Sequence, residues 1–158
     1  MNFIQKAIKQ NKEKKEIEYQ QSVCIVIPTI EITINNLKNR ISYFGQTKHN
    51  ITQENIDNFL YFLDILNSSY INFLFDLRLY QQKYKQPYNS DIKDDIKEKI
   101  DYMLEKKKEY RKEFESIYDN FKRTTKGVDF PRRNEILGLM RKAFDFDSSK
   151  YYQYNTSN

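Results

Sequence analysis

The chain has little of what sharp turns, covalent cross-links and metal sites require. Its 158 residues include three glycines, three prolines, one cysteine, one histidine and no tryptophan. Because turns depend on glycine and proline, so few of them indicate a small number of long secondary-structure elements. Sandwiches and barrels need many turns, so an all-β architecture is disfavoured.

The lone cysteine and the lone histidine offer little chemistry. A single cysteine, Cys24, excludes an internal disulfide. Cys24 lies in the apolar run 23–27, which predicts a buried and inert thiol, since a reactive thiol needs a basic and partly exposed setting. Cys24 and His49 supply two ligands at most, whereas a structural zinc ion takes four. The sequence therefore predicts no metal site, no cofactor and no catalytic Cys–His pair.

The carboxylates do not form a catalytic constellation either. The start of a predicted helix contains Asp91, Asp94 and Asp95. Acidic side chains at this position cap the helix and keep its surface soluble. Asp64 and Asp76 are twelve residues apart on an apolar segment, too far along a helix to act as an acid–base pair. We therefore expect a protein that is not an enzyme and has no small-molecule substrate.

No stretch is typical of a membrane span or of a targeting signal. The most apolar window, residues 59–80, contains Asp64, Asp76 and Arg78. A charge near the bilayer centre costs on the order of 3 kcal/mol, so this window is expected to be a buried helix. The lysines near the start are followed closely by glutamates, unlike a secretory signal or a mitochondrial presequence. We expect a soluble intracellular protein, cytoplasmic or nuclear.

Aromatic residues are what the chain has in abundance, with 13 tyrosines and 11 phenylalanines. Aromatics in this number argue against a disordered chain, and the length suits one domain. We expect a single helical domain over residues 1–158, with flexible ends at 1–15 and 148–158. Heavy use of lysine, isoleucine, asparagine and tyrosine is typical of an AT-rich genome.

The clearest pattern predicts a long helix over about residues 52–86. Thr52 is a suitable N-cap, and Pro87 ends the segment. Apolar residues recur at three–four spacing without a slip: Ile56, Phe59, Leu63, Leu66, Tyr70, Phe73, Leu77, Tyr80 and Tyr84. Further apolar residues lie off this stripe, which indicates a central helix covered on several sides.

A second long helix is predicted over about residues 90–126, with Ser90 as N-cap and Gly127 just beyond its end. Its apolar stripe consists of Ile92, Ile96, Ile100, Met103, Tyr110, Phe114, Ile117 and Phe121. Each helix is a rod of roughly 50 Å. Because the joining loop is short, the two rods should pack antiparallel.

Two N-terminal helical segments and a short C-terminal helix complete the predicted fold. The first segment is amphipathic, with Phe3, Ile4, Ala7 and Ile8, and Pro28 interrupts the helix after it. The second, about residues 29–44, shows helical spacing, which we favour, although alternation within 23–34 also fits a strand. The last helix starts near Pro131. The fold class is all-α, an elongated antiparallel helical bundle.

The apolar and aromatic stripes support the leading functional hypothesis. A bundle of this size does not easily hide so much aromatic surface, and exposed apolar patches mark interaction sites. We therefore expect a non-catalytic helical subunit or adaptor of a multiprotein complex, which binds other protein subunits through apolar and aromatic helix faces.

A basic run over residues 122–142 supports the alternative hypothesis. Its candidate binding residues are Lys122, Arg123, Lys126, Arg132, Arg133, Arg141 and Lys142. Such a patch is expected of an accessory DNA- or RNA-binding subunit of a nucleic-acid-modifying enzyme complex, or of a protein that binds an acidic partner. The lysines of the first fifteen residues would enlarge the patch if the two regions met in space.

Helix ends offer a simpler explanation for most of this basic run. Helix C-termini favour lysine and arginine because of the helix dipole. Arg132 and Arg133 do not fit this explanation, since they are predicted at a helix start, where acids are favoured.

Overall fold

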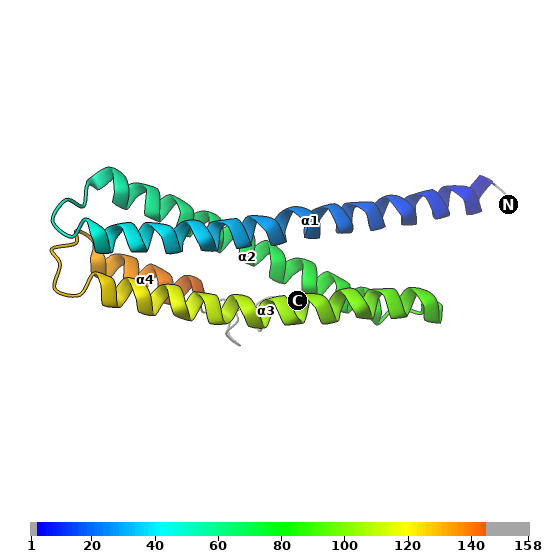
Figure 1. The fold of residues 1–158 in the computed structure, drawn as a ribbon. Helices are drawn as coiled ribbons and strands as arrows, with labels where there is room; N and C mark the ends of the chain where they lie inside the picture. The colour runs from blue at the N-terminus through cyan, green and yellow to red at the C-terminus, as the bar shows by residue number, and fades with distance from the viewer. Residues whose placement is uncertain (1–2, 145–158) are drawn as a thin grey trace.

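The computed structural model describes the backbone of residues 3–144 and the side chains of residues 3–9 and 25–144. This part of the chain contains helices and loops and no strand: α1 (Phe3–Gln46), α2 (Gln53–Tyr84), α3 (Ser90–Thr124) and α4 (Arg133–Phe144). Three long helices pack side by side and the short α4 lies along one end (Figure 1). The predicted all-α elongated bundle is confirmed. Of the two ends predicted to be flexible, residues 148–158 lie outside the described residues, and residues 3–15 form the start of α1.

α1 is one helix where the sequence predicted two, because Pro28 lies inside it and does not end it. Proline has no amide hydrogen for the carbonyl four residues earlier, which usually breaks a helix. Here Pro28 is exposed, so its ring lies on the solvent-facing side of the helix. The hydroxyl of Thr29 donates to the carbonyl of Ile25 at 2.7 Å, and Thr33 donates to Thr29 at 2.6 Å. These two bonds add donors to the helix turns around the proline.

The part of α1 that follows Pro28 has helical and not strand periodicity. Ile30, Leu37 and Phe44 are at most 2% exposed, whereas Ile32 is 67% exposed. A strand would place Ile30 and Ile32 on the same face. Residues 23–34, for which the sequence left helix and strand open, are therefore helical. This stripe is where α1 packs on the other helices.

α2 and α3 form the predicted antiparallel pair of long helices. The predicted stripes are buried except at the α2–α3 turn, where Tyr84 and Ile92 are exposed. The side chain of Thr52 accepts a hydrogen bond from the amide of Asn55, as expected of an N-cap. Asn89, not the predicted Ser90, caps α3, because its Oδ1 accepts from the amide of Ile92 at 3.0 Å.

The connection from α3 to α4 contains two residues with positive φ. Gly127 has a φ of 75°, a conformation in which glycine carries no steric penalty, so it suits the position just after a helix. Arg132 has a φ of 64° and directly precedes α4. Pro131 lies in the turn before the helix and not in its first turn, a small correction to the prediction.

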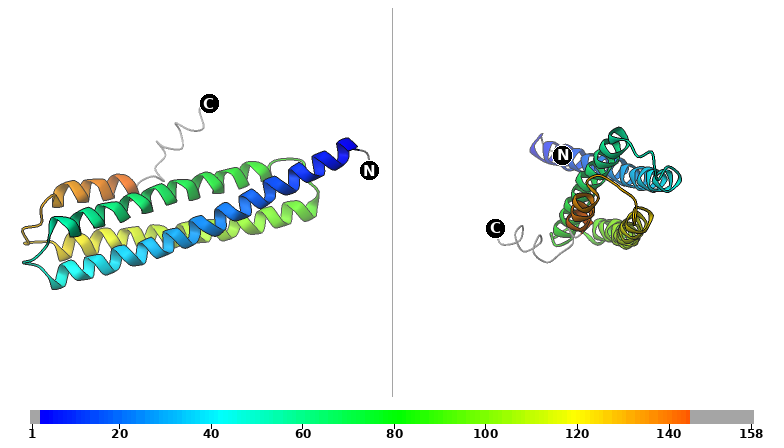
Figure 2. Two further views of the ribbon diagram at one scale, coloured as in Figure 1. Left: turned by 90° about the horizontal axis from the view of Figure 1, so that it is seen from above. Right: turned by 90° about the vertical axis from the view of Figure 1, so that its left-hand side faces the viewer.

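An aromatic cluster fills the core between α1, α2, α3 and the α3–α4 loop. Phe44 and Phe59 lie 5.5 Å apart, and Phe59 stacks on Phe121 at 5.2 Å between ring centroids. Phe130 from the α3–α4 loop packs edge-on against Phe44 at 5.0 Å and against Phe121 at 5.3 Å. Aromatic pairs of this kind add about 0.5–1.5 kcal/mol each beyond the apolar area that they bury. This cluster lies at the end of the bundle where α4 runs beside the other helices (Figure 2).

The long helices differ in length, and this leaves part of α1 uncovered. α1 and α3 run in the same direction, and a Cβ placed on Gly45 would lie 3.3 Å from Cγ2 of Thr124, so the two helices finish together. Because α1 has 44 residues and α3 has 35, α1 is nine residues longer. Nine residues correspond to about 13 Å of helix. The N-terminal turns of α1 therefore extend past the other helices (Figure 1). We call residues 3–11 the overhang.

Candidate functional site

The seven basic residues of the predicted site do not form one surface. Lys122, Arg123, Lys126, Arg132 and Arg133 lie where α3 ends and α4 begins. Arg141 and Lys142 lie near the opposite end of α4, roughly 12 Å further along that helix. Lys6 and Lys9 of the overhang lie at the other end of the molecule (Figure 1). The N-terminal lysines therefore do not enlarge the basic run.

Arg133 connects the start of α4 to the end of α3. Its Nε donates to Oγ1 of Thr125 at 2.8 Å, and its Nη2 donates to the carbonyl of Lys122 at 2.8 Å. Thr125 is 1% exposed and donates in turn to the carbonyl of Phe121 at 2.6 Å. The last carbonyls of a helix have no partner within it, so Arg133 satisfies one at the negative end of α3. The sequence shows only that Arg133 lies near the start of its own helix. It therefore did not predict this contact with α3.

Arg132 is paired within its own turn. Its guanidinium donates two hydrogen bonds to the carboxylate of Glu135, Nε to Oε2 at 2.8 Å and Nη2 to Oε1 at 2.7 Å. These hydrogen bonds raise the pKa of Arg132 and lower the pKa of Glu135 below its usual range. Glu135 also lies in the first turn of α4, where a negative charge is favourable. The charge of Arg132 is thus already partly balanced.

Lys122, Arg123 and Lys126 are the exposed remainder of the basic cluster at this end. Arg123 donates to the side-chain oxygen of Asn120. The C-termini of α1 and α3 converge here, and both favour positive charge nearby. Helix-end electrostatics therefore explains these three residues, as the sequence indicated.

A groove of about 610 Å³ lies between α3 and α4, away from the basic cluster. Phe114 and Phe144 stack within it at 4.8 Å between ring centroids. The remaining lining residues combine both charges and one phenol: Arg111, Glu115, Tyr118, Asp119 and Arg141. Arg141 therefore belongs to a surface of mixed charge.

A carboxylate, an amine and a phenol meet between α1 and α3. Oε1 of Glu31 accepts a hydrogen bond from Nζ of Lys106 at 2.8 Å and one from the hydroxyl of Tyr110 at 3.3 Å. The hydrogen bond to Glu31 raises the pKa of Lys106, and burial raises the pKa of Tyr110. An amine or a phenol needs a lowered pKa to act as a general base near neutral pH, and the shifts of Lys106 and Tyr110 have the opposite sign. The cluster serves as a polar cross-link between the two helices.

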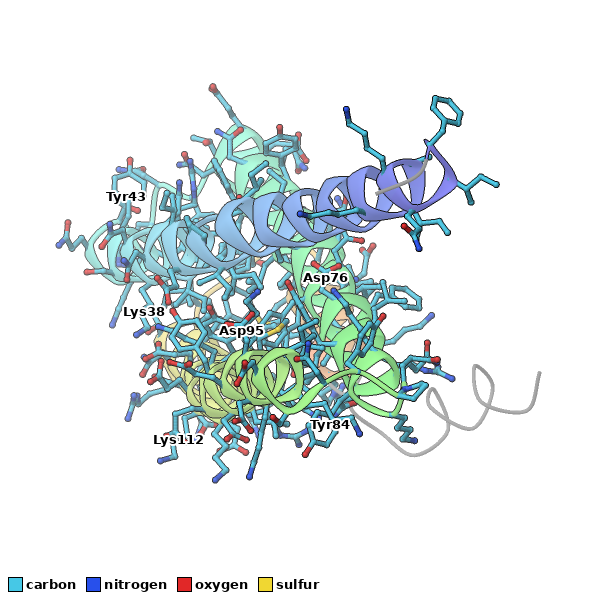
Figure 3. All side chains as sticks on the ribbon, turned by 90° about the vertical axis from the view of Figure 1, so that its right-hand side faces the viewer. Lys38, Tyr43, Asp76, Tyr84, Asp95 and Lys112 are labelled. Carbon is cyan, nitrogen blue, oxygen red and sulfur yellow. The ribbon has the colours of Figure 1, made fainter. Side chains whose placement is uncertain are left out.

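The overhang carries an apolar face that no other described element covers. Phe3 is 87% exposed, Ile4 67% and Ile8 52%. At 100° per residue, these three and Ala7 span an arc of about 140°, and Lys6 and Lys9 lie outside this arc. Figure 3 shows these N-terminal turns standing clear of α2 and α3. The sequence predicted the amphipathic face, but not that it would project beyond the bundle.

Comparisons with known proteins find no matching family model, no matching curated protein and no matching solved structure. None of the described helices is both long enough and apolar enough to cross a membrane. Within residues that the structure describes, no group of three or more histidine, cysteine or acidic side chains could hold a metal ion. The side chain of Cys24 lies outside the described side chains.

Proposed function

We propose that the protein is a non-catalytic helical subunit or adaptor that binds a partner protein through an apolar helix face. The observation that supports this proposal is the overhang of α1. It presents Phe3, Ile4 and Ile8 to solvent on one face of a helix that is already formed. Helices that bind in grooves use anchors with this three–four spacing.

The energetics of the overhang favour a bound state. Fully burying a phenylalanine or isoleucine side chain contributes about 1.5–3 kcal/mol. Isolated helical turns are marginal in water, but residues 3–11 continue a long packed helix and need no new nucleus. The partner therefore meets a face that is ordered in advance, which reduces the entropy lost on binding.

The nucleic-acid alternative depends on Lys122, Arg123 and Lys126. We rank it second, because Arg132 and Arg133 already make intramolecular contacts. If this alternative holds, the logarithm of the binding constant for DNA or RNA falls linearly with the logarithm of salt concentration, and charge removal at these three residues reduces the slope. Binding that is insensitive to salt would argue against phosphate contacts.

The proposed function is tested by removing the apolar face without removing the helix. We expect the wild-type chain to bind a hydrophobic dye or to associate, and the variant Phe3→Ser/Ile4→Ser/Ile8→Ser to lose both. The matched control is Lys6→Ser/Lys9→Ser, on the opposite face of the same turns. Thermal unfolding followed by circular dichroism checks that each variant folds. A wild-type monomer that melts cooperatively and binds no dye would contradict the proposal.

A further inference from the structure

We infer that a groove between α1 and the start of α2 binds an organic oxyanion, a small molecule that carries a phosphate or carboxylate group. The groove has a volume of about 360 Å³, which is within the range of small-molecule sites. Its lining consists of Asn36, Asn39, Arg40, Tyr43 and Phe44 of α1 and Asn55 of α2. The groove and the overhang lie in different halves of α1, so this inference goes beyond the proposed function and does not depend on it.

The sign of its charge distinguishes this groove. Among the described residues that line it, Arg40 is the one that carries a charge. The groove between α3 and α4, by contrast, contains two arginines and two acidic residues, and a groove between α1 and α3 contains lysines together with glutamates. An anion in the α1–α2 groove therefore meets a positive charge that no carboxylate of the lining balances.

Arg40 is held in one orientation by its neighbours. Its Nε donates to Oδ1 of Asn36 at 2.8 Å, and its guanidinium carbon lies 4.5 Å from the centroid of the Phe62 ring. Stacking on an aromatic ring and a hydrogen bond at one edge restrict the rotation of the planar guanidinium. Its two terminal nitrogens make no ion pair or hydrogen bond with a described residue. Arginine binds a phosphate or a carboxylate through parallel hydrogen bonds from such nitrogens.

Three neutral polar groups lie in the same groove as Arg40. They are the side-chain amides of Asn39 and Asn55 and the hydroxyl of Tyr43, and none of them is hydrogen-bonded to another described residue. Each can donate to an oxygen of the ligand. The Tyr43 side chain is 47% exposed, so its ring offers an apolar surface to the organic part of the ligand.

The charged residues of α1 and α2 close to the groove do not remove its positive character. On α1, Lys38 pairs with Glu113 of α3, and Figure 3 shows Lys38 and Tyr43 on opposite sides of the helix. On α2, Asp57 accepts a hydrogen bond from Gln53 and lies near enough to Arg132 to raise the pKa of that arginine.

Glu54 is the remaining acid beside the groove, and it directly precedes Asn55 in the first turn of α2. Consecutive residues of a helix are 100° apart, so Glu54 lies on the face next to that of Asn55 and is not part of the lining. The positive end of the helix dipole explains an acid at this position.

Titration of the full-length chain with phenyl phosphate, benzoate and inorganic phosphate tests the inference. We expect at least one organic probe to bind saturably by isothermal titration calorimetry, and inorganic phosphate to bind more weakly. Arg40→Met keeps a long side chain over Phe62 but removes the charge, and should raise the dissociation constant about tenfold or more. Arg141→Met, in the groove with both charges, is the matched control and should bind like the wild type.

A second variant keeps the test valid if Arg40→Met does not fold. Asn39→Ala/Asn55→Ala leaves Arg40 and its contacts in place, and should weaken binding of the same probe severalfold. Circular dichroism verifies that each variant is folded. Binding of phenyl phosphate alone would assign the ligand group as a phosphate, and binding of benzoate alone would assign it as a carboxylate.

The other outcomes contradict the inference. Inorganic phosphate that binds as tightly as the organic probes would overturn the organic ligand. Absence of saturable binding at millimolar concentrations, or binding that neither the arginine nor the asparagine variant weakens, would overturn the site itself. None of these results affects the proposed function, because the variants leave the overhang unchanged.

Discussion

The two ends of α1 use apolar residues in opposite ways. Between Ile30 and Phe44 the apolar stripe is buried against the other helices. Between Phe3 and Ile8 an equally clear stripe faces solvent. The helix is continuous, so local conformation does not cause the difference. The cause is the shorter length of α3, which ends alongside α1 and begins about nine residues short of its start.

This difference shows that an amphipathic pattern predicts a helix and a face, but not what covers the face. In the packed part the face contributes to folding, and in the overhang the same kind of face is available for association. Substitutions in the two parts should therefore affect different measurements.

The largest expected effect compares one apolar residue from each part. Leu37→Ala should lower the free energy of unfolding by about 2–5 kcal/mol, because it leaves a cavity at a fully buried site. Ile8→Ala should change the stability of the monomer by less than about 0.5 kcal/mol. Urea unfolding at low protein concentration measures both. Equal losses would mean that the overhang is packed within the monomer.

Pro28 lies between the overhang and the packed part of α1, and its replacement should stabilise the helix that joins them. Proline inside a helix costs roughly 3 kcal/mol relative to alanine, and part of this is offset because proline also restricts the unfolded chain. We expect Pro28→Ala to raise the free energy of unfolding by about 2 kcal/mol, since the exposed ring has little packing to lose. Pro131→Ala, at the exposed proline outside the helices, is the control and should give no such gain.

At the packed end, Arg133 should matter more than its neighbour Arg132. Arg133→Met removes hydrogen bonds to the carbonyl of Lys122 and to the buried hydroxyl of Thr125. Losing hydrogen bonds of this kind costs about 0.5–1.5 kcal/mol each. The loss for Arg132→Met should be smaller, because its pair with Glu135 is exposed. Chemical denaturation distinguishes the two, and a larger loss for Arg132→Met would contradict a stabilising role of the contact between Arg133 and α3.

The smallest expected effect is a loss of stability in alkali. The pKa values of Lys106 and Tyr110 are raised in the folded state, so both groups hold their protons more tightly than in the unfolded chain. Their contribution is complete below the ordinary pKa values of about 10 and is lost as the pH rises through the raised values. Tyr110→Phe should reduce this loss between neutral pH and about pH 11, with Tyr61→Phe as the matched control. An unchanged pH slope would exclude a role for Tyr110.

Much of the fold could be predicted because its signals are local. The three–four stripes and the N-cap at Thr52 gave α2 and α3 to within two residues at most of their ends. The prediction that the helix is interrupted at Pro28 was wrong. It considered only the local cost of a proline within a helix, whereas the packing of residues 30–44 and the exposure of the proline ring outweigh that cost.

The candidate site was harder to predict than the fold. Lys122, Arg123 and Lys126 could be assigned to a helix end from their positions in the sequence. Arg133 could not, because its partners belong to α3 and the contact depends on how α4 folds back. The overhang could not be predicted either, since residues 3–8 alone do not show where α3 begins.

The sequence by itself determined which segments are helical and which face of each is apolar. Those properties follow from hydrogen bonds between residues four apart and from a period of 3.6, so a short window of sequence contains them. The tertiary structure decided that α1 is longer than its neighbours, that Arg133 caps α3 and that the overhang faces solvent. These properties depend on how elements far apart in the chain align, and the free energy of that alignment comes from burying several stripes at once.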